Sequence, residues 1–520
     1  MRSDVIIIGA GPTGLMLAYE LALAGVSPLV LEKAPAPRTE PKANGLVGQI
    51  VELLRYRGLL DRFRTEARFV GAPPAFTFGA VTLRLSQLTE SPLQLLALPQ
   101  PRLEALLTEC VLERDVEIRR AHRVTSVSPD DDGVTVDVQG PDGDRRMRAS
   151  YVVGCDGAHS LVREQAGIAF PGAVNTDVTR IGHVVIPEQF VAADGGLDVP
   201  GAGRLPLGWS YTPHGRLGIM AFGPGVHIVS VTEANPAAAD AGTAATLDEL
   251  RAAVRRVLGA DLPMSEPRWL SLVVTQARQA ERYRAGRVLL AGDAAHLFPA
   301  GGSALNAGMS DAINLGWKLA AQVQGWAPPG LLDSYHTERH AAAARTLAHT
   351  RAQARMMAVT PDGAALRDLV GELVRYAEPL RHIAETVHGS DVRYPVAQAD
   401  DQEVHPLVGR LVPDLALDGC PAADRVSGLL RAGRPFLLDL SGDRPLGAVQ
   451  SGWGHRVDLF SARCATPSAD ALLVRPDGFV VWAADPNVSD AHVGTTLSRA
   501  LSTWFGSDRR PTAGATSAPQ

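Results

Sequence analysis

The sequence contains few cysteines, and they are scattered along the chain. Only four occur among 520 residues, with no CxxC motif: Cys110, Cys155, Cys420 and Cys464. This pattern leaves no thiolate zinc site and suits a reducing cytosol better than a disulfide scaffold. Scattered single thiols are typical of a reducing compartment, so we expect a cytoplasmic protein.

A basic block, a long apolar run and a metal-binding pattern are also missing. The 50 Lys and Arg against 56 Asp and Glu leave a net charge of −6, which argues against nucleic acid because phosphates require clustered cations. No apolar run reaches the roughly 18 residues of a membrane span. His336 and His340 lack the glutamate of an HExxH motif, which predicts a solvated helix face. His159 and His296 are assigned structural roles, and we expect no metal.

A glycine-rich segment near the N-terminus predicts a dinucleotide site. A strand expected over Asp4–Ile8 leads into Gly9-Ala10-Gly11-Pro12-Thr13-Gly14, and a helix over Gly14–Ala24 and a strand over Leu29–Leu31 follow. In such a unit the first glycine permits a tight turn, the second admits a pyrophosphate, and the third lets helix and strand pack closely. The helix N-terminus offers N–H groups to the phosphates. Glu32 is placed to accept both ribose hydroxyls and would repel a 2′-phosphate.

A second segment places an aspartate directly after a short strand. The strand is expected over Tyr151–Val153, and Cys155-Asp156-Gly157-Ala158-His159-Ser160 follows it. We expect Asp156 and Gly157 to form a turn near the cofactor. Arg163 is placed to reach either a phosphate or Asp156.

A third segment repeats this arrangement farther along the chain. The strand Arg287–Leu290 delivers Asp293 toward a ribityl or ribose hydroxyl, and Pro299, Gly301 and Gly302 form a loop that admits a flat ligand. A helix expected over Leu305–Gln324 points its N-terminus at this loop, where a positive dipole end would stabilise reduced flavin. In this order, the three segments predict a fold that wraps one FAD.

Further elements are expected on both sides of a change in sequence texture. Short apolar runs alternate with Gly and Pro from about Phe170 to Leu272, which predicts an antiparallel sheet with a helix over Leu247–Leu258. The other helices are expected over Gln49–Arg64, Pro101–Arg114, Ser334–Ala358, Gly363–Val387 and Thr495–Phe505. The other strands are expected over Glu117–Val127, Val134–Val138, Phe436–Leu440, Arg456–Phe460, Ala471–Val474 and Phe479–Trp482, with a turn at Arg475-Pro476-Asp477-Gly478.

Additional stretches carry a family resemblance over nearly the whole chain. They are Leu98-Pro99-Gln100-Pro101-Arg102, Gln279–Arg284, Asp311–Lys318, and Leu332-Asp333-Ser334-Tyr335 followed by Glu338-Arg339. With the three segments above, the chain resembles the class A FAD-dependent aromatic monooxygenases, which have the para-hydroxybenzoate hydroxylase fold. Within this family it looks most similar to the bacterial aromatic polyketide hydroxylases.

The resemblance implies an α/β fold with three parts. These are a Rossmann-type, glutathione reductase-like FAD-binding domain, an antiparallel-sheet substrate domain, and a C-terminal thioredoxin-like domain without CxxC, which would be structural or serve association. The expected boundaries are 1–170 and 273–396 for the FAD-binding domain with its helices, 171–272 for the sheet, 397–506 for the thioredoxin-like domain, and 507–520 for a disordered tail.

The resemblance also implies a reaction. NADPH or NADH, bound transiently, would reduce FAD, and O₂ would form a flavin C4a-hydroperoxide that inserts one oxygen atom into a polycyclic aromatic polyketide in antibiotic biosynthesis. The flavin carries the chemistry, so no catalytic side chain is named. The protein would be a monomer or homodimer. Alternatives are a Baeyer–Villiger or rearranging enzyme, a flavin oxidase or reductase acting on a small phenol or antibiotic, and a non-catalytic FAD-binding protein.

Two sets of candidate site residues follow. The motifs, with family positions at Gln100, Arg102 and Val124 and a cation at Lys42, predict these cofactor contacts: Gly9, Gly11, Pro12, Thr13, Gly14, Glu32, Lys33, Lys42, Gln100, Arg102, Val124, Asp156, Gly157, Asp293, Pro299, Gly301, Gly302, Ser303, Ala304, Leu305 and Asn306. The substrate-pocket candidates are Gln49, Trp209, Tyr211, Met220 and Phe222. Three features depart from the family: Ser303-Ala304 replaces Gln-Gly, the loop before it is one residue shorter, and Gln49 replaces an arginine.

Overall fold

Strand β1 (Arg2–Ile8) lies in the middle of the sheet on which the first unit is built. The protein is described by a computed structural model that covers residues 2–39, 43–223, 225–234, 245–300, 303–396, 404–442, 446–486 and 488–507; of residues 2, 175, 176, 222 and 223 it gives the backbone alone. β1 pairs in parallel with β2 (Leu29–Leu31) on one side and with β11 (Gly143–Gly154) on the other. β8 (Glu117–Arg119) and β20 (Val288–Leu290) extend the parallel core outward.

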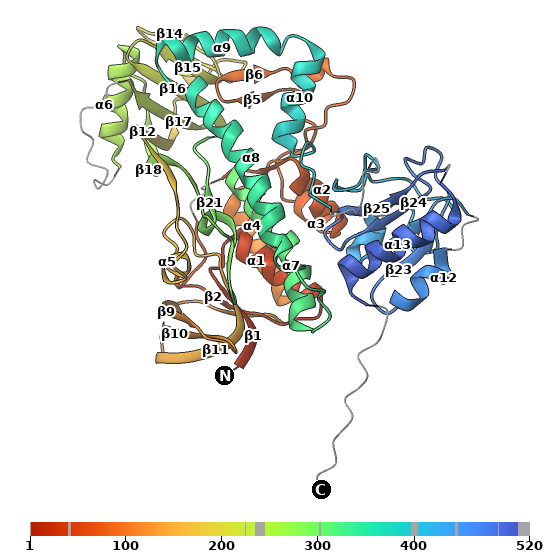
Figure 1. Cartoon of the computed structure of the whole chain (residues 1–520). Coiled ribbons are helices and arrows are strands. Elements are labelled where there is room, and N and C mark those ends of the chain that lie inside the picture. The colour runs from red at the N-terminus through yellow and green to blue at the C-terminus, as the bar shows by residue number, and fades with distance from the viewer. Residues whose placement is uncertain are drawn as a thin grey trace.

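Three helices cover this sheet. α1 (Pro12–Leu23) packs against α4 (Gln100–Leu112) and α7 (Ser303–Val323), and Figure 1 shows them side by side. Ile6 and Ile7 of β1 are fully buried, as expected for a parallel strand covered on both faces. The sheet is completed by β9 (Arg123–Pro129), β10 (Val134–Gly140) and β19 (Arg284–Ala285).

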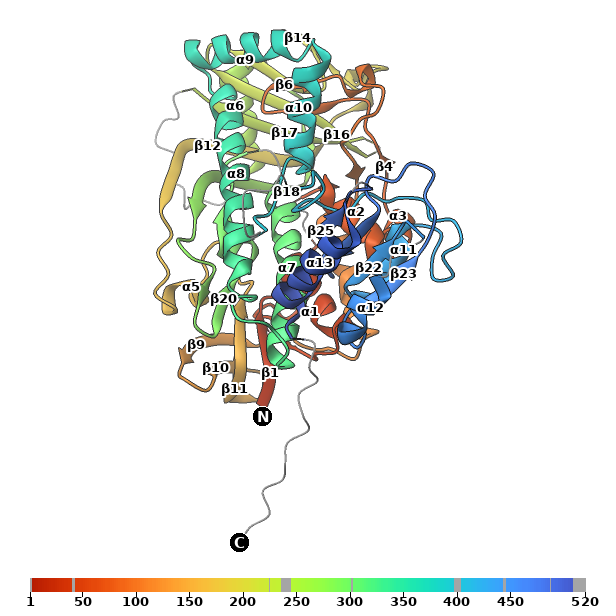
Figure 2. The same ribbon diagram turned by 45° about the vertical axis from the view of Figure 1, so that its right-hand side comes forward.

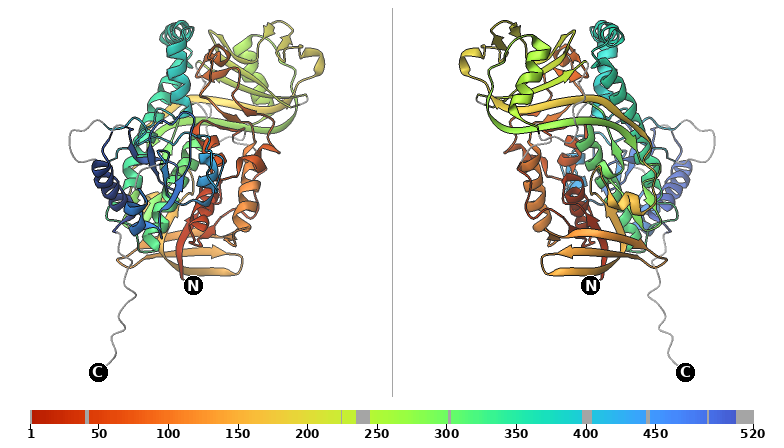
Figure 3. Two further views of the ribbon diagram at one scale, coloured as in Figure 1. Left: turned by 90° about the vertical axis from the view of Figure 1, so that its right-hand side faces the viewer. Right: turned by 90° about the vertical axis from the view of Figure 1, so that its left-hand side faces the viewer.

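The second unit is an antiparallel sheet with one helix on its outer face. Its strand order is β15-β16-β17-β12-β18-β21, with bounds Gly208–Thr212, Gly215–Gly223, Val226–Glu233, Gly172–Val185, Ser265–Gln279 and His296–Leu297. Alternate residues of β16 and β17, such as Leu217 and Val229, pack under α6 (Leu247–Leu258), as the period of two in a strand requires. α6 lies on the side of the sheet away from α8 (Figures 1 and 3).

Long strands join the first two units. β18 runs through the expected boundary at residue 272, and its end pairs with β21 of the third motif. Helices and short strands around this junction are α2 (Gln49–Tyr56), α3 (Leu60–Arg64), α5 (Leu161–Gln165), α8 (Ser334–Met356), α9 (Pro361–Leu373), α10 (Ala377–His388), β3 (Leu46–Val47), β4 (Val70–Gly71), β5 (Phe76–Phe78), β6 (Val81–Leu83), β7 (Leu95–Leu96), β13 (Leu197–Val199) and β14 (Gly203–Leu205).

The C-terminal unit is a mixed sheet that packs beside α7. Its order is β23-β22-β24-β25, with bounds Asp458–Ser461, Phe436–Asp439, Ala471–Val474 and Val480–Ala484; β22 and β23 are parallel and the other pairs antiparallel. The helices of this unit are α11 (Val426–Leu429), α12 (Leu446–Gln450) and α13 (Asp490–Phe505). α13 crosses in front of α7 in Figure 2. The thioredoxin-like assignment of this unit stays a prediction.

The predicted α/β class is confirmed, and the main differences are expected elements that the structure divides in two. The helix expected over Gln49–Arg64 is two helices, because Gly58 adopts φ +69° and ends α2. The strand expected over Glu117–Val127 breaks where Ala121 adopts φ +56°. The helix expected over Gly363–Val387 divides before Pro379, since a proline in the first turn of α10 cannot continue a preceding helix. Most of the expected tail, residues 508–520, lies outside the described residues.

Within the described ranges, the model contains no helix with the length and apolar character needed to cross a membrane.

A buried ion pair ties the first unit to the C-terminal unit. Arg57, which follows α2, donates to Glu20 of α1 at 2.7 and 2.9 Å and to the carbonyls of Leu430 and Pro476. Both side chains are about 1–2% exposed. A single loss of the arginine would therefore leave a buried carboxylate without its cation.

We expect Arg57→Met to lower the free energy of unfolding by about 3–5 kcal/mol, because Glu20 is then buried unpaired. Glu20→Leu/Arg57→Met should recover most of that loss, which thermal unfolding of the three proteins would measure. Arg145→Met, which removes an exposed pair with Asp142, is the control and should change stability by less than about 1 kcal/mol. A double variant no more stable than the single one would contradict the assignment.

Candidate functional site

A cavity of about 580 Å³ opens at the carboxyl ends of the parallel strands of the first unit. The turns after β1, β2, β11 and β20 all contribute to its wall, which is where ligands bind open parallel sheets. The structure brings these predicted cofactor residues together on it: Gly9, Gly11, Pro12, Thr13, Glu32, Lys33, Gln100, Val124, Asp156, Gly157, Asp293, Ala304 and Leu305. The three sequence motifs therefore form a single extended site.

The glycines of the first motif have different surroundings. A Cβ on Gly9 would lie 2.3 Å from the Cys155 carbonyl oxygen, and a Cβ on Gly14 would lie 2.0 Å from that of Gly9. These two positions require glycine for packing, and Gly14 accordingly does not line the cavity. A Cβ on Gly11 meets no protein atom within 4 Å, so the backbone there is open to a ligand, as a bound pyrophosphate requires.

Acidic side chains on the cavity wall are held by backbone amides. Glu32 accepts hydrogen bonds from Ala10 N and Ala34 N, both at 2.8 Å, through different oxygens. Each carboxylate oxygen keeps a second lone pair, which suits the two hydroxyls of a ribose. Asp156 accepts from the Ser160 hydroxyl at 2.5 Å and from Val162 N, and burial raises the pKa of its carboxyl group.

Several cations on the cavity were not singled out from the sequence. Arg38 and Arg120 line it together with Lys33, and within the described residues their side chains make no hydrogen bond or ion pair. Arg120 directly follows β8, the parallel neighbour of β2, so its position at the same sheet edge was available from the strand order. His159, to which the sequence analysis assigned a structural role, also lines the cavity.

Some predicted cofactor residues lie away from this cavity. Arg102 is on the outer side of α4, where it donates to Glu66 at 2.7 Å, and Pro299 is buried and does not line the cavity. Arg163 reaches neither Asp156 nor the cavity; it donates to the carbonyls of Ala158 and Ala294 and so joins the second motif to the third. Lys42, Gly301 and Gly302 lie outside the described residues.

A second, smaller cavity of about 80 Å³ lies on the other side of the first turn of α7 from the larger one, which is the predicted FAD cavity. Ser303 and Asn306 line it, whereas Ala304 and Leu305 between them face the larger cavity. Gln49 also lines the smaller cavity rather than the larger one. The side chains of Ser303, Asn306 and Gln49 are therefore divided from the larger cavity by the helix turn that carries Ala304.

The substrate-pocket candidates of the second unit share one face of its sheet. Trp209, Tyr211 and Met220 lie on the face opposite α6. Met220 alternates along β16 with residues that pack under that helix, and Trp209 and Tyr211 pair with residues of β16 on the same face as Met220. Met220 is 56% exposed, while Tyr211 lies under the Arg367 guanidinium at 4.0 Å. Arg216 on the same face donates to the Met357 carbonyl at the end of α8. The Phe222 side chain lies outside the described residues.

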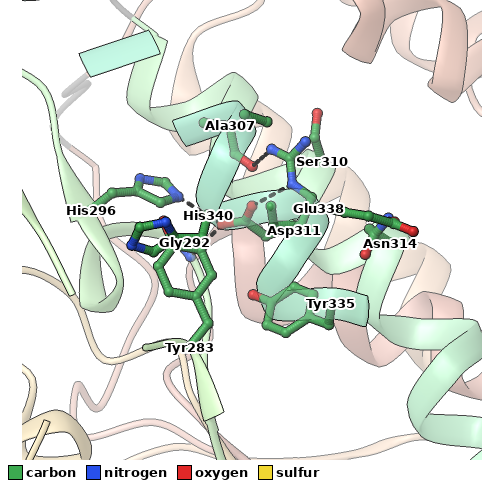
Figure 4. A network of polar contacts seen from close by, with 12 residues as sticks. Tyr283, Gly292, His296, Ala307, Ser310, Asp311, Asn314, Tyr335, Glu338 and His340 are labelled. Carbon is green, nitrogen blue, oxygen red and sulfur yellow. Dashed lines mark hydrogen bonds and ion pairs between the residues drawn. The ribbon is translucent and has the colours of Figure 1, made fainter. Parts of the chain in front are cut away.

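The remaining motif residues form a buried polar network. Asp311 of α7 accepts from Gly292 N at 3.1 Å, from His296 Nε2 at 2.7 Å and from Arg339 Nε at 2.7 Å. Figure 4 shows Gly292 and His296 on one side of Asp311, and Glu338 and Asn314 on the other. Arg339 holds the pKa of Asp311 low together with His296, against the effect of burial. The family stretches Asp311–Lys318 and Glu338-Arg339 thus hold the third motif in place.

The expectation that His336 and His340 form a solvated face is only half right, because both side chains are half-buried. Their rings pack at 4.8 Å from each other and at 5.9 and 5.4 Å from the ring of Tyr283. Burial lowers the pKa of both imidazoles. The reason is tertiary: β18 leads Tyr283 onto the side of α8 that carries both histidines.

Comparison with known families agrees with this site. A family model for an FAD binding domain matches residues 2–350, and one for the C-terminal part of aromatic-ring hydroxylases matches residues 405–508. The chain belongs to the FAD-binding aromatic-ring hydroxylase family. This confirms the resemblance stated from the motifs, and with it FAD as the cofactor of the family.

Similar proteins cover almost the full length. A 12-dehydrotetracycline 5-monooxygenase/anhydrotetracycline 6-monooxygenase of Streptomyces rimosus is 42% identical over 97% of this chain and 99% of its own length. The structure of OxyS anhydrotetracycline hydroxylase from Streptomyces rimosus, also 42% identical, matches with a TM-score of 0.85 over 97% of this chain and 99% of that one. The structure of the Diels-Alderase PyrE3, from the pyrroindomycin biosynthetic pathway, is 37% identical and matches with a TM-score of 0.80 over 97% and 100%. The expectation of a flavin-dependent monooxygenase is confirmed at the level of the family.

We expect Gly11→Val to weaken FAD binding roughly tenfold or more, because the added side chain occupies the open side of the turn without meeting protein atoms. The thermal stability of the FAD-free protein should stay unchanged, since Gly11 has ordinary extended dihedral angles, φ −77° and ψ 178°. Flavin fluorescence quenching measures the Kd. Gly371→Val, which also enters open space but lies on α9, is the control. Unchanged FAD affinity in Gly11→Val would rule out pyrophosphate binding at this turn.

Two neutral histidines on the smaller cavity predict a pH-dependent stability. Burial lowers the pKa of His349 and of His388 to about 4. Because the unfolded chain binds protons at pKa near 6.5, stability is lost as the pH falls from about 6.5 to about 4, by about 2 kcal/mol per histidine at pH 5. His349→Gln/His388→Gln should unfold at temperatures that differ less between pH 7 and pH 5. His492→Gln is the control, because His492 is exposed on α13, and it should behave like the parent. If the double variant and the control show the same pH dependence of unfolding temperature, the prediction is refuted.

Proposed function

We propose that this protein is an FAD-dependent, NAD(P)H-consuming monooxygenase that inserts one atom of O₂ into a polycyclic aromatic polyketide in antibiotic biosynthesis. The observation that carries the proposal is the junction of the two sheets. β21 leads from the third motif toward α7 and is hydrogen-bonded to β18 of the antiparallel sheet. The sheet that carries the substrate-pocket candidates is therefore joined directly to the third motif through one strand pair.

Different residues along the cavity would bind different parts of FAD. Gly9 to Gly14 and the N-terminus of α1 would bind the pyrophosphate, with Arg38 and Arg120 near it and Glu32 on the ribose. Bound FAD supplies the redox chemistry and the activation of O₂. The N-terminus of α7 would place its positive dipole end beside the isoalloxazine and favour negative charge there.

The side chains of the sheet face opposite α6 would orient the substrate. Trp209 and Met220 offer apolar surface on that face, and burial lowers the pKa of the neighbouring Arg216. The relative that oxidises anhydrotetracycline in Streptomyces rimosus supports a flat polycyclic substrate for this chain. NADPH or NADH would bind transiently, since the described residues contain no second glycine motif of the Rossmann kind.

A second candidate function comes from one comparison. The Diels-Alderase PyrE3 shares the fold and 37% of the aligned residues, so a chain with this fold can carry out carbon–carbon bond formation. In that case FAD would stabilise the fold or position the substrate without transferring oxygen. Oxygen transfer separates the two candidates.

We expect FAD-loaded protein to oxidise NADPH or NADH faster when a polycyclic phenol is present, and to incorporate one oxygen atom from ¹⁸O₂ into the product, read as a mass increase of two units over the ¹⁶O₂ product. Gly11→Val, depleted of FAD, is the control and should give no labelled product. Formation of hydrogen peroxide with no labelled product would indicate an oxidase. An isomerised product of unchanged mass, formed without O₂ consumption, would indicate a pericyclic enzyme. Either result would refute monooxygenation of that substrate.

A further inference from the structure

The C-terminal unit contributes a buried arginine to the core between α7 and α8. Arg475, in the turn between β24 and β25, is fully buried, and its guanidinium donates to both oxygens of Glu338 at 2.6 and 2.8 Å. It also donates to Asp477 at 3.0 and 2.5 Å. Lys318 of α7 donates to Glu338 at 2.7 Å from the other side. Two cations and two carboxylates therefore balance one another in a dry core.

The residue after Glu338 extends this contact toward the first turn of α7. Arg339 donates to Asp311 at 2.7 Å, to the Ala307 carbonyl at 3.2 Å and to the Tyr394 hydroxyl at 2.9 Å. The Tyr394 ring stacks on Phe479 of the C-terminal unit with 4.1 Å between ring centroids. The C-terminal unit thus contacts Glu338 through Arg475, and it contacts Tyr394, a partner of Arg339, through Phe479.

Asp311 connects this pair to the FAD cavity. Through one oxygen it accepts from Gly292 N and from His296, and Gly292 is followed by Asp293 on the cavity wall. Gly292 adopts φ +65° and its Cα lies against Thr13 of the first motif, so that a Cβ would come within 2.6 Å of the Thr13 hydroxyl. The packing leaves the turn little freedom once Asp311 is held in place.

We propose that the C-terminal unit positions the flavin-binding wall: Arg475 and Tyr394 hold Glu338 and Arg339 of α8, and these hold Asp311, the Gly292-Asp293 turn and the first turn of α7. Arg475, Tyr394, Arg339 and Asp311 are positioning residues, since they act through the backbone of Gly292 and Ala307. A unit without CxxC then contributes to flavin binding through buried ion pairs that position the cavity wall. Buried charges permit this role, because each must keep its partner in a low dielectric.

The most conservative test is Tyr394→Phe in the full chain. It keeps the ring that stacks on Phe479 and removes only the hydroxyl that accepts from Arg339. We expect the FAD Kd to rise roughly three- to tenfold, as for the loss of one ordinary hydrogen bond, with a shifted visible spectrum and midpoint potential of bound FAD. Tyr376→Phe is the control, because Tyr376 is 69% exposed, and it should leave all three values unchanged.

A second set of variants separates positioning from folding. Arg475→Met leaves Asp477 without its cation, whereas Arg475→Met/Asp477→Asn keeps the charges balanced through the Lys318–Glu338 pair. We expect the double variant to recover thermal stability while its FAD Kd stays at least roughly tenfold above that of the parent, and Arg475→Lys to recover part of the affinity. Arg434→Met, which removes a partly exposed pair with Asp458 in the same unit, should bind FAD normally.

The proposal fails if Tyr394→Phe and the folded double variant both bind FAD with the affinity, spectrum and potential of the parent; the C-terminal unit then only stabilises the fold. These readouts require bound FAD but no turnover, so they remain decisive even if the parent oxidises no aromatic substrate. The ratio of oxygenated product to hydrogen peroxide, which should fall in the same variants, rests on the proposed function and is read only where the parent is active.

Discussion

Buried, paired charges hold α7, α8 and the C-terminal unit together. Glu338 and Asp311 are almost fully buried, and a buried carboxylate is tolerated only when cations and hydrogen-bond donors surround it. Lys318, Arg339 and Arg475 supply those cations from three different parts of the chain. The first unit and the C-terminal unit are therefore joined by charge as well as by apolar packing.

The same helix organises the functional region. α7 packs against α1, carries Asp311 in its third turn, and presents successive residues of its first turn to two different cavities. Successive side chains of an α-helix are rotated by about 100° around its axis. Residues two positions apart, such as Ala304 and Asn306, therefore face nearly opposite sides. The departure from the family pattern at Ser303-Ala304 thus affects two cavities, with only the alanine on the FAD side.

Much of the FAD site was predictable from local sequence. Strand–glycine–helix order placed Gly9, Gly11 and Glu32, and aspartates following buried strands placed Asp156 and Asp293, because parallel strands end at one edge of a sheet. Arg102, Gln49 and Arg163 were placed less well. Their side chains are long enough to reach several partners, and the choice among Glu66, the smaller cavity and the Ala294 carbonyl depends on neighbours distant in sequence.

Local sequence was enough to predict the β-α-β unit, the FAD motifs, the antiparallel texture of the second unit and the turn at Arg475–Gly478, since each depends on local periodicity and on glycine or proline chemistry. Only the tertiary structure decided what that turn does, why Asp311 and Glu338-Arg339 belong to the family pattern, and that His336 and His340 pack on Tyr283. These roles arise from contacts between residues far apart in the sequence, such as Asn314 and Asp477, which are 163 positions apart, and no local pattern records which distant charge will meet which.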